Sequence, residues 1–131
     1  MVKARLHVMS VFVDDQEKAR GFYTDRLGFV VKRDIPLGEY RWLTLVGSDA
    51  PDGVELLLEP DENPAAQDYT RALAEQGIPA ASFAVEDVDA AYEELVAAGV
   101  TFLQAPTTGG PVRTAVLDDT CGNLVQLVSP V

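Results

Sequence analysis

Apolar and polar positions follow two rhythms along the chain, and both rhythms occur twice in the same order. Over residues 5–13 the side chains alternate between two sides, as they do in a strand. Asp14-Asp15 then provides capping groups for a helix that carries Phe22-Tyr23 and stops at Gly28. Turn-forming residues divide the next stretch into three predicted strands, near 29–34, 40–47 and 53–59.

The second half predicts the same order of elements. A strand near 79–85 leads to a helix over 86–98, and the predicted strands that follow lie near 101–104, 111–118 and 123–129. Between the halves, Asn63-Pro64 is typical of a helix start and Gly77 of a helix end. We therefore expect one α+β domain over residues 1–131, built from module one (1–60), a connecting helix (61–77) and module two (78–131).

The two halves are also related residue by residue. Residues 10–19 return at 82–91, a shift of 72 positions, with four identical pairs and two exchanges of one acid for another. Arg41 and Arg113 are related by the same shift, and residues 54–57 match 125–128 one position out of step. Two such βαβββ modules, related by a pseudo-twofold axis, can pair curved mixed sheets around a cavity that neither module encloses alone.

Composition narrows the choice of partners. A net charge of −11 argues against nucleic acid, whose phosphates require a basic surface, and against anionic membrane surfaces. No apolar run approaches the length needed to span a bilayer, and the single cysteine, Cys121, fits a reducing compartment. We expect a cytoplasmic protein that binds a small organic molecule and pairs with a second copy of itself.

Several short motifs resemble the vicinal-oxygen-chelate superfamily, which includes glyoxalase I, bleomycin-resistance proteins, extradiol dioxygenases and methylmalonyl-CoA epimerase. The likeness is weakest between residues 61 and 77 and otherwise extends over nearly the whole chain. The residues that carry it are Val13-Asp14-Asp15, Phe22-Tyr23, Leu27-Gly28-Phe29, Val85-Glu86-Asp87-Val88, Gly99-Val100 and the Asp118–Asn123 turn. These motifs belong to the framework, so the resemblance implies the fold and leaves the activity open.

The resemblance also implies where a metal would bind. Metal-dependent members hold a divalent ion with four side chains, usually His and Glu, and these positions fall on Val8, Glu55, Ala80 and Gln126. Two of the four lack a donor atom, and a neutral amide is a weak ligand for a transition metal. We therefore expect no metal or other cofactor. The alternative is a divalent metal on Glu55 and Gln126, joined by His7 if a bulge turns that side chain inward.

Glu55 is the candidate catalytic residue. Its neighbours Val54 and Leu56 point to the opposite side of the strand, so Glu55 is expected to face the cavity. An unpaired carboxylate in that setting would have a raised pKa and could act as a general base or bind a cationic ligand. A salt bridge to Arg41 or Arg113, or an outlet to solvent, is an equally weighted alternative.

The predicted cavity lining is small or apolar, with a few polar groups. Trp42 would supply a stacking wall for a planar ligand, although packing is the commoner role of a lone tryptophan. The residues expected to line the cavity are Val8, Ser10, Phe12, Trp42, Glu55, Ala80, Ser82, Thr114 and Gln126.

Three functions are compatible with these features. The first is a metal-free, bleomycin-resistance-like protein that encloses an apolar or aromatic molecule. The second is a metal-dependent lyase, isomerase or dioxygenase with an altered ligand set centred on Glu55. The third is a dimeric structural or regulatory module. The sequence leaves open the ligand, whether a reaction is catalysed, and whether the modules pair within one chain or are swapped between subunits.

Overall fold

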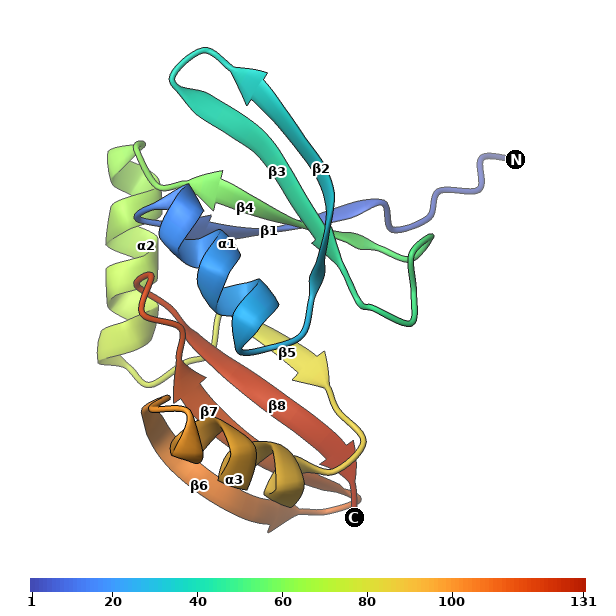
Figure 1. Cartoon of the computed structure of the whole chain (residues 1–131), viewed down its shortest axis with the longest axis vertical. Helices are drawn as coiled ribbons and strands as arrows, with labels where there is room; N and C mark the ends of the chain where they lie inside the picture. The colour runs from blue at the N-terminus through green and yellow to red at the C-terminus, as the bar shows by residue number, and fades with distance from the viewer. The chain divides into compact units, whose positions relative to one another are not determined.

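The computed structural model describes residues 1–131 and divides into two compact units, Met1–Asp61 and Glu62–Val131 (Figure 1). The first unit contains one helix and a four-stranded sheet in the order β1-β4-β3-β2, with β1 parallel to β4 and the other pairs antiparallel. Its elements are β1 (Val8–Val13), α1 (Gln16–Asp25), β2 (Val30–Leu37), β3 (Tyr40–Val46) and β4 (Glu55–Pro60).

The second unit repeats this arrangement after an additional helix. Its sheet has the order β5-β8-β7-β6, and β5 is parallel to β8. Its elements are α2 (Pro64–Glu75), β5 (Ala81–Ala84), α3 (Val88–Ala97), β6 (Phe102–Gly109), β7 (Val112–Asp118) and β8 (Leu124–Pro130). The predicted α+β class and the order of elements are therefore confirmed.

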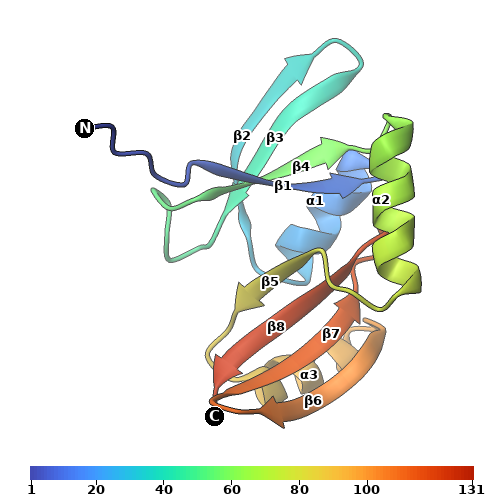
Figure 2. The same ribbon diagram turned by 180° about the vertical axis from the view of Figure 1, so that it is seen from behind.

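One helix packs on one face of each sheet. In the first unit α1 contacts β2, β3 and β4, and its Ala19 and Tyr23 are fully buried. In the second unit α3 contacts β6, β7 and β8 and buries Val88 and Leu95. Opposite views show each sheet with its own helix on one side only (Figures 1 and 2). Each sheet therefore has a second face that no helix of its βαβββ repeat covers.

Matching aspartates begin the two packed helices. The Asp15 carboxylate accepts a hydrogen bond from the Lys18 amide at 2.9 Å, and Asp87 accepts one from the Ala90 amide at 3.1 Å. Each bond satisfies an amide group that the first helical turn leaves without an internal partner. Asn63 caps α2 in the same way, followed by Pro64, as the sequence predicts.

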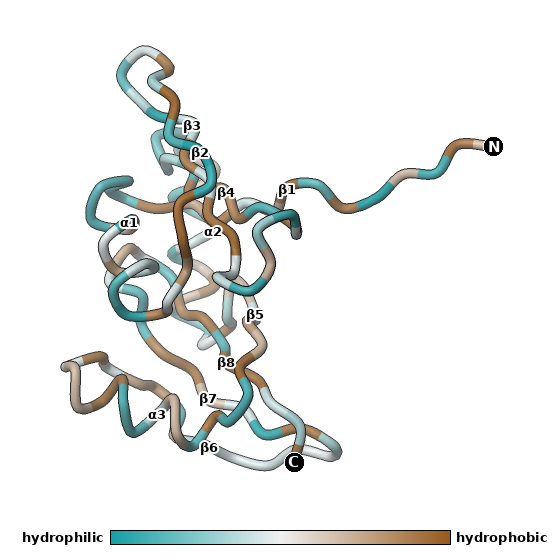
Figure 3. Tube along the Cα trace, turned by 45° about the vertical axis from the view of Figure 1, so that its right-hand side comes forward, coloured by the Kyte–Doolittle hydropathy of each residue, from teal (hydrophilic) through white to brown (hydrophobic).

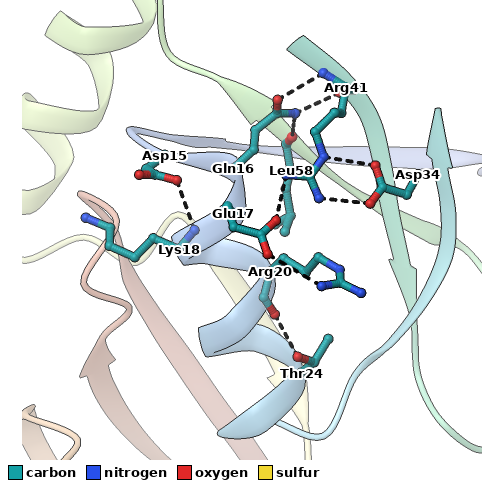
Figure 4. A network of polar contacts seen from close by, with 9 residues as sticks. All are labelled: Asp15, Gln16, Glu17, Lys18, Arg20, Thr24, Asp34, Arg41 and Leu58. Atoms are coloured by element: carbon teal, nitrogen blue, oxygen red, sulfur yellow. Dashed lines mark hydrogen bonds and ion pairs between the residues drawn. The ribbon is translucent and has the colours of Figure 1, made fainter. Parts of the chain in front are cut away.

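A buried glutamine docks α1 onto its sheet. Gln16 donates from Nε2 to the carbonyls of Arg41, at 2.7 Å, and Leu58, at 2.9 Å, and its Oε1 accepts from the Arg41 amide at 3.0 Å. Figure 4 shows this side chain between the helix and two strands. Because all three hydrogen bonds end on backbone groups of β3 and β4, Gln16 sets the position of the helix start.

The two repeated arginines, Arg41 and Arg113, are ion-paired to acids of their own units other than Glu55. Arg41 contacts both oxygens of Asp34, at 2.9 and 2.8 Å, and Glu17 at 2.7 Å (Figure 4). Arg113 donates hydrogen bonds to both carboxylate oxygens of Asp89, at 2.6 and 2.8 Å. These contacts tie the first turn of each helix to its sheet.

Two strands extend further than predicted. The sequence predicts strands near 29–34 and 101–104, with turns at the prolines that follow, whereas β2 continues to Leu37 and β6 to Gly109. Both strands lie at the edge of a sheet, where proline is tolerated because the missing amide would face no neighbouring strand. The turns instead use Gly38 and Gly110, whose φ angles are 60° and 57°.

No helix in this structure is both long and apolar enough to cross a membrane.

Candidate functional site

Strand register places the predicted lining residues of the first unit on one sheet face. Val8, Ser10 and Phe12 of β1 lie opposite Glu55, Leu57 and Glu59 of β4, and Thr44 also pairs with Leu57. Since directly paired residues point to the same side of a sheet, this face also carries Trp42. The other face carries Leu43, Leu45 and Leu58, which are fully buried. The predicted set is therefore on the helix-free face.

The second unit places its share of the predicted residues in the same way. Ser82 pairs with Gln126, and Gln126 pairs in turn with Val116 of β7. Thr114 is two residues from Val116 and shares its face. The amide of Ala80 donates to the Leu124 carbonyl at 2.8 Å, so Ala80 continues the ladder of β5 although it lies before the strand begins.

Glu55 is buried, and one of its two carboxylate oxygens, Oε1, holds both of its side-chain contacts. The residue is 6% exposed, and its carboxylate accepts a hydrogen bond from the Thr44 hydroxyl at 2.7 Å and lies 3.3 Å from Nε of Arg33. The Thr44 hydrogen bond lowers the pKa of Glu55, and the charges of Arg33 and His7 lower it further, against the opposing effect of burial. The carboxylate is therefore ionised at neutral pH and is not poised as a general base.

Arg33 is the partner that sequence reasoning missed. The expected salt bridge of Glu55 was to Arg41 or Arg113, and this choice is wrong because both are bound to other acids. A register shift between Val31 and Arg33 inserts one extra residue into β2 and pairs Arg33 with Thr44. Without the bulge, strict alternation would place Lys32 there, so the pattern alone could not identify Arg33.

In the structure, the residues of β4 and β8 that correspond by the internal repeat differ from those that the sequence indicated. Gln126 pairs with Ser82, whose repeat partner is Ser10, and Ser10 pairs with Leu57. Gln126 thus corresponds to Leu57, a shift of 69 positions for this strand, and Glu55 lies two residues earlier on the same face. The argument that matched Glu55 with Gln126 by repeat is therefore wrong, because the turn before the last strand differs in length between the units.

The residues at the implied ligand positions do not fit a metal centre. Val8 and Ala80 offer no donor atom, and the Gln126 amide donates to the Ser82 hydroxyl at 3.0 Å. Glu55 already holds a hydroxyl and lies beside a guanidinium, whose positive charge disfavours a cation. No group of three or more His, Cys, Asp or Glu side chains is arranged to hold an ion.

His7 lies outside the strand that was expected to contain it. The side chain is exposed, and β1 begins only at Val8. The His7 carbonyl accepts from the Glu55 amide at 3.0 Å, which holds this segment beside the start of β4. His7 and Glu55 line a common pocket, together with basic residues.

A protein-family model described as the Glyoxalase/Bleomycin resistance protein/Dioxygenase superfamily matches residues 5–127. The match covers nearly the whole chain, including all three helices and every strand except the end of β8. The chain belongs to this superfamily. The resemblance identified from the framework motifs is confirmed.

Two proteins of Bacillus subtilis are relatives of this chain. The Bacillus subtilis protein YurT is 51% identical over 124 residues, covering 95% of this chain and 98% of YurT. The Bacillus subtilis protein YetH is 34% identical over 110 residues, with 81% of each chain covered.

Solved structures with a similar fold include UcmS2 and TnmS3. The crystal structure of UcmS2 matches with a TM-score of 0.83 and 36% identity, over 97% of this chain and 98% of UcmS2. TnmS3, an antibiotic binding protein from Streptomyces sp. CB03234, matches with a TM-score of 0.79 and 28% identity, over 100% and 99% of the two chains.

Proposed function

We propose that this protein binds a small organic molecule without a metal ion, holding an apolar or aromatic part of it against the helix-free face of the first unit's sheet. The observation that carries the proposal is the chemistry of this face. Trp42 pairs with Ile35 and Tyr40 with Leu37, and Ile35 and Leu37 are 48% and 57% exposed. An exposed row of large apolar side chains on a soluble domain is typical of a binding surface.

The polar groups on the faces support recognition rather than catalysis. In the second unit, Gln126 is bonded to Ser82, and Gln104 donates to the Thr114 hydroxyl at 3.2 Å. Such neutral amide and hydroxyl groups orient a ligand without supplying a strong acid or base. The similarity to TnmS3, itself an antibiotic binding protein, favours the same class of function for this chain.

A homodimer belongs to the same proposal. Each sheet has two edge strands, which are hydrogen-bonded to a neighbouring strand on one side only. A second copy of the same chain commonly covers such edges. Sedimentation at micromolar concentration should give twice the mass of the chain. A monomer under these conditions would remove the dimer from the proposal.

The single tryptophan provides the test of binding. We expect quenching of Trp42 fluorescence by at least one member of a panel of aromatic antibiotics, with a saturable titration. By calorimetry, Trp42→Ala should weaken binding of that compound at least tenfold. Tyr69→Ala, which removes an exposed aromatic on α2, is the matched control and should change affinity less than twofold. No quenching across the panel, or an equal loss in both variants, would contradict the proposal.

Elemental analysis separates this function from the metal-dependent alternative. Protein purified without chelator should contain far less than one equivalent of nickel, zinc, manganese or iron. Stoichiometric metal that is lost in Glu55→Ala would overturn the metal-free proposal and favour a metal-dependent lyase, isomerase or dioxygenase.

A further inference from the structure

A pocket in the first unit is polar, unlike the apolar row beside Trp42. It has a volume of about 400 Å³ and lies between the segment before β1, the start of β2 and the loop before β4. Its charged lining consists of Arg5, His7, Lys32, Arg33, Asp52 and Glu55. With His7 counted as neutral, three cations face two carboxylates, which leaves one positive charge. This is a local reversal in a chain whose net charge is −11.

Glu55 orients the Arg33 side chain but occupies only one of its hydrogen-bonding nitrogens. Only Nε is engaged, at 3.3 Å from Glu55, and the side chain is 51% exposed. The two terminal nitrogens make no further hydrogen bond within the chain. Because a guanidinium presents parallel donors in a rigid fork, this geometry leaves a bidentate site for an oxyanion. Glu55 thus acts as a positioning residue for Arg33.

The neighbouring cations differ in how firmly they are held. Lys32 donates to the Pro51 carbonyl at 2.8 Å and lies 3.7 Å from Asp52, so its charge is already paired with groups of the chain. Arg5 is exposed and makes no ion pair. Hydrophilic and hydrophobic positions alternate along the segment before β1 (Figure 3). The hydrogen bond from the Glu55 backbone amide to the His7 carbonyl holds the end of this segment at the pocket.

We propose that this pocket binds the carboxylate group of a small organic acid, held by the free nitrogens of Arg33 and by Arg5. One net positive charge matches a monoanion. A dianion such as phosphate would leave excess negative charge near Glu55 and Asp52, and like charges at short range repel. The proposal does not rest on the proposed function, because it concerns a polar pocket rather than the apolar row beside Trp42.

The only histidine provides a direct reporter for the pocket. We expect the ring signals of His7 in NMR spectra of the full chain to shift saturably with benzoate at constant pH. Benzamide, which has nearly the same shape and no charge, should cause no saturable shift, and inorganic phosphate should bind at least tenfold more weakly than benzoate. Equal shifts with benzamide, or tighter binding of phosphate, would overturn the proposal.

Charge-removing variants test which residues hold the anion. Arg33→Gln should weaken benzoate binding at least tenfold, and Arg5→Gln at least threefold. Arg71→Gln on α2 removes an exposed arginine whose partner is Asp68, and it should leave the affinity within twofold.

The unpaired Glu55 could unfold the Arg33→Gln protein, so the double variant Arg33→Gln/Glu55→Gln removes both charges together. Unchanged benzoate affinity in Arg5→Gln and in the double variant would overturn the proposal. The indole signal of Trp42 distinguishes the two sites. Shifts of His7 with benzoate, combined with no ligand for Trp42 in the aromatic panel, would support this pocket and contradict the proposed function.

Discussion

The two units share a framework and differ in the chemistry of their helix-free faces. Both start a packed helix with a capping aspartate and both tie that helix to the sheet through an arginine–acid contact. The helix-free face of the first unit contains an ion pair between Arg33 and Glu55, whereas the second has the neutral pair of Ser82 and Gln126. Repetition thus preserved the contacts that form the fold and left the surface free to diverge.

The turn before the last strand shows the largest local difference. In the second unit it is closed by Asp119, which is fully buried and accepts from the amides of Cys121 and Asn123 at 2.7 and 3.0 Å. The corresponding loop of the first unit is longer, and Asp52 and Gly53 in that loop line the basic pocket. A tight turn in the second unit therefore occupies the place of a longer loop in the first.

The largest expected effect comes from opening the tight turn. Asp119→Ala should lower the free energy of unfolding by about 3 kcal/mol, because it leaves buried amide groups without an acceptor. Urea denaturation followed by circular dichroism measures the loss. Asp118→Ala, which removes one exposed bond to the Thr120 amide, should cost about 1 kcal/mol and serves as control. Equal losses would show that burial of Asp119 is unimportant.

A smaller effect follows from making the two helix starts alike. Gln16→Val installs the residue type of Val88, which lies at the matching position of the second unit. We expect a loss of about 2 kcal/mol, since backbone groups of Arg41 and Leu58 lose their partners. Gln67→Val on the exposed surface of α2 is the control and should change stability by less than about 0.5 kcal/mol. A stable Gln16→Val protein would mean that water replaces the glutamine.

Removing the arginine–acid contacts should have the third-largest effect on stability. Arg41→Gln breaks contacts to two acids and should cost about 1 kcal/mol, since ion pairs at the surface are weak. Arg113→Gln breaks the contact to one acid and should cost less. The two variants are each other's control in thermal unfolding, and a larger loss from Arg113→Gln would reverse the expected order.

The smallest expected effect is a dependence on pH. Hydrogen bonds from Arg41 lower the pKa of Asp34, so this pair stabilises the folded state above the ordinary pKa of aspartate. The stabilisation is lost as the pH falls through the lowered pKa. The difference in stability between the wild type and Arg41→Gln should therefore narrow from pH 7 to about pH 3. A difference that stays constant over this range would show that Asp34 contributes nothing.

Local patterns allowed much of the framework to be predicted. Alternation, capping residues and glycine positions identified the order of the elements, and the cap at Asn63-Pro64 and the turn glycine Gly28 are where they were expected. The predicted ends of strands failed at Pro36 and Pro106. Whether a proline ends a strand depends on whether that strand lies at an edge, and a single sequence does not show this.

The chemistry of the candidate site was less predictable. That Glu55 projects to the face opposite Val54 and Leu56 needed only a period of two, and the register agrees with it. Its pairing with Arg33 depends on a bulge, and the match of Gln126 with Leu57 depends on the lengths of two turns. These are relations between strands, so no window of the sequence contains them.

The amino-acid sequence alone determined the doubled βαβββ plan, because short-range periodicity and helix caps act within a few residues. Only the tertiary structure decided that Glu55 is ionised, hydrogen-bonded to Thr44 and committed to Arg33, since a pKa depends on which charges are brought close in space. The same long-range register assembled a basic pocket from three separate segments of a strongly acidic chain.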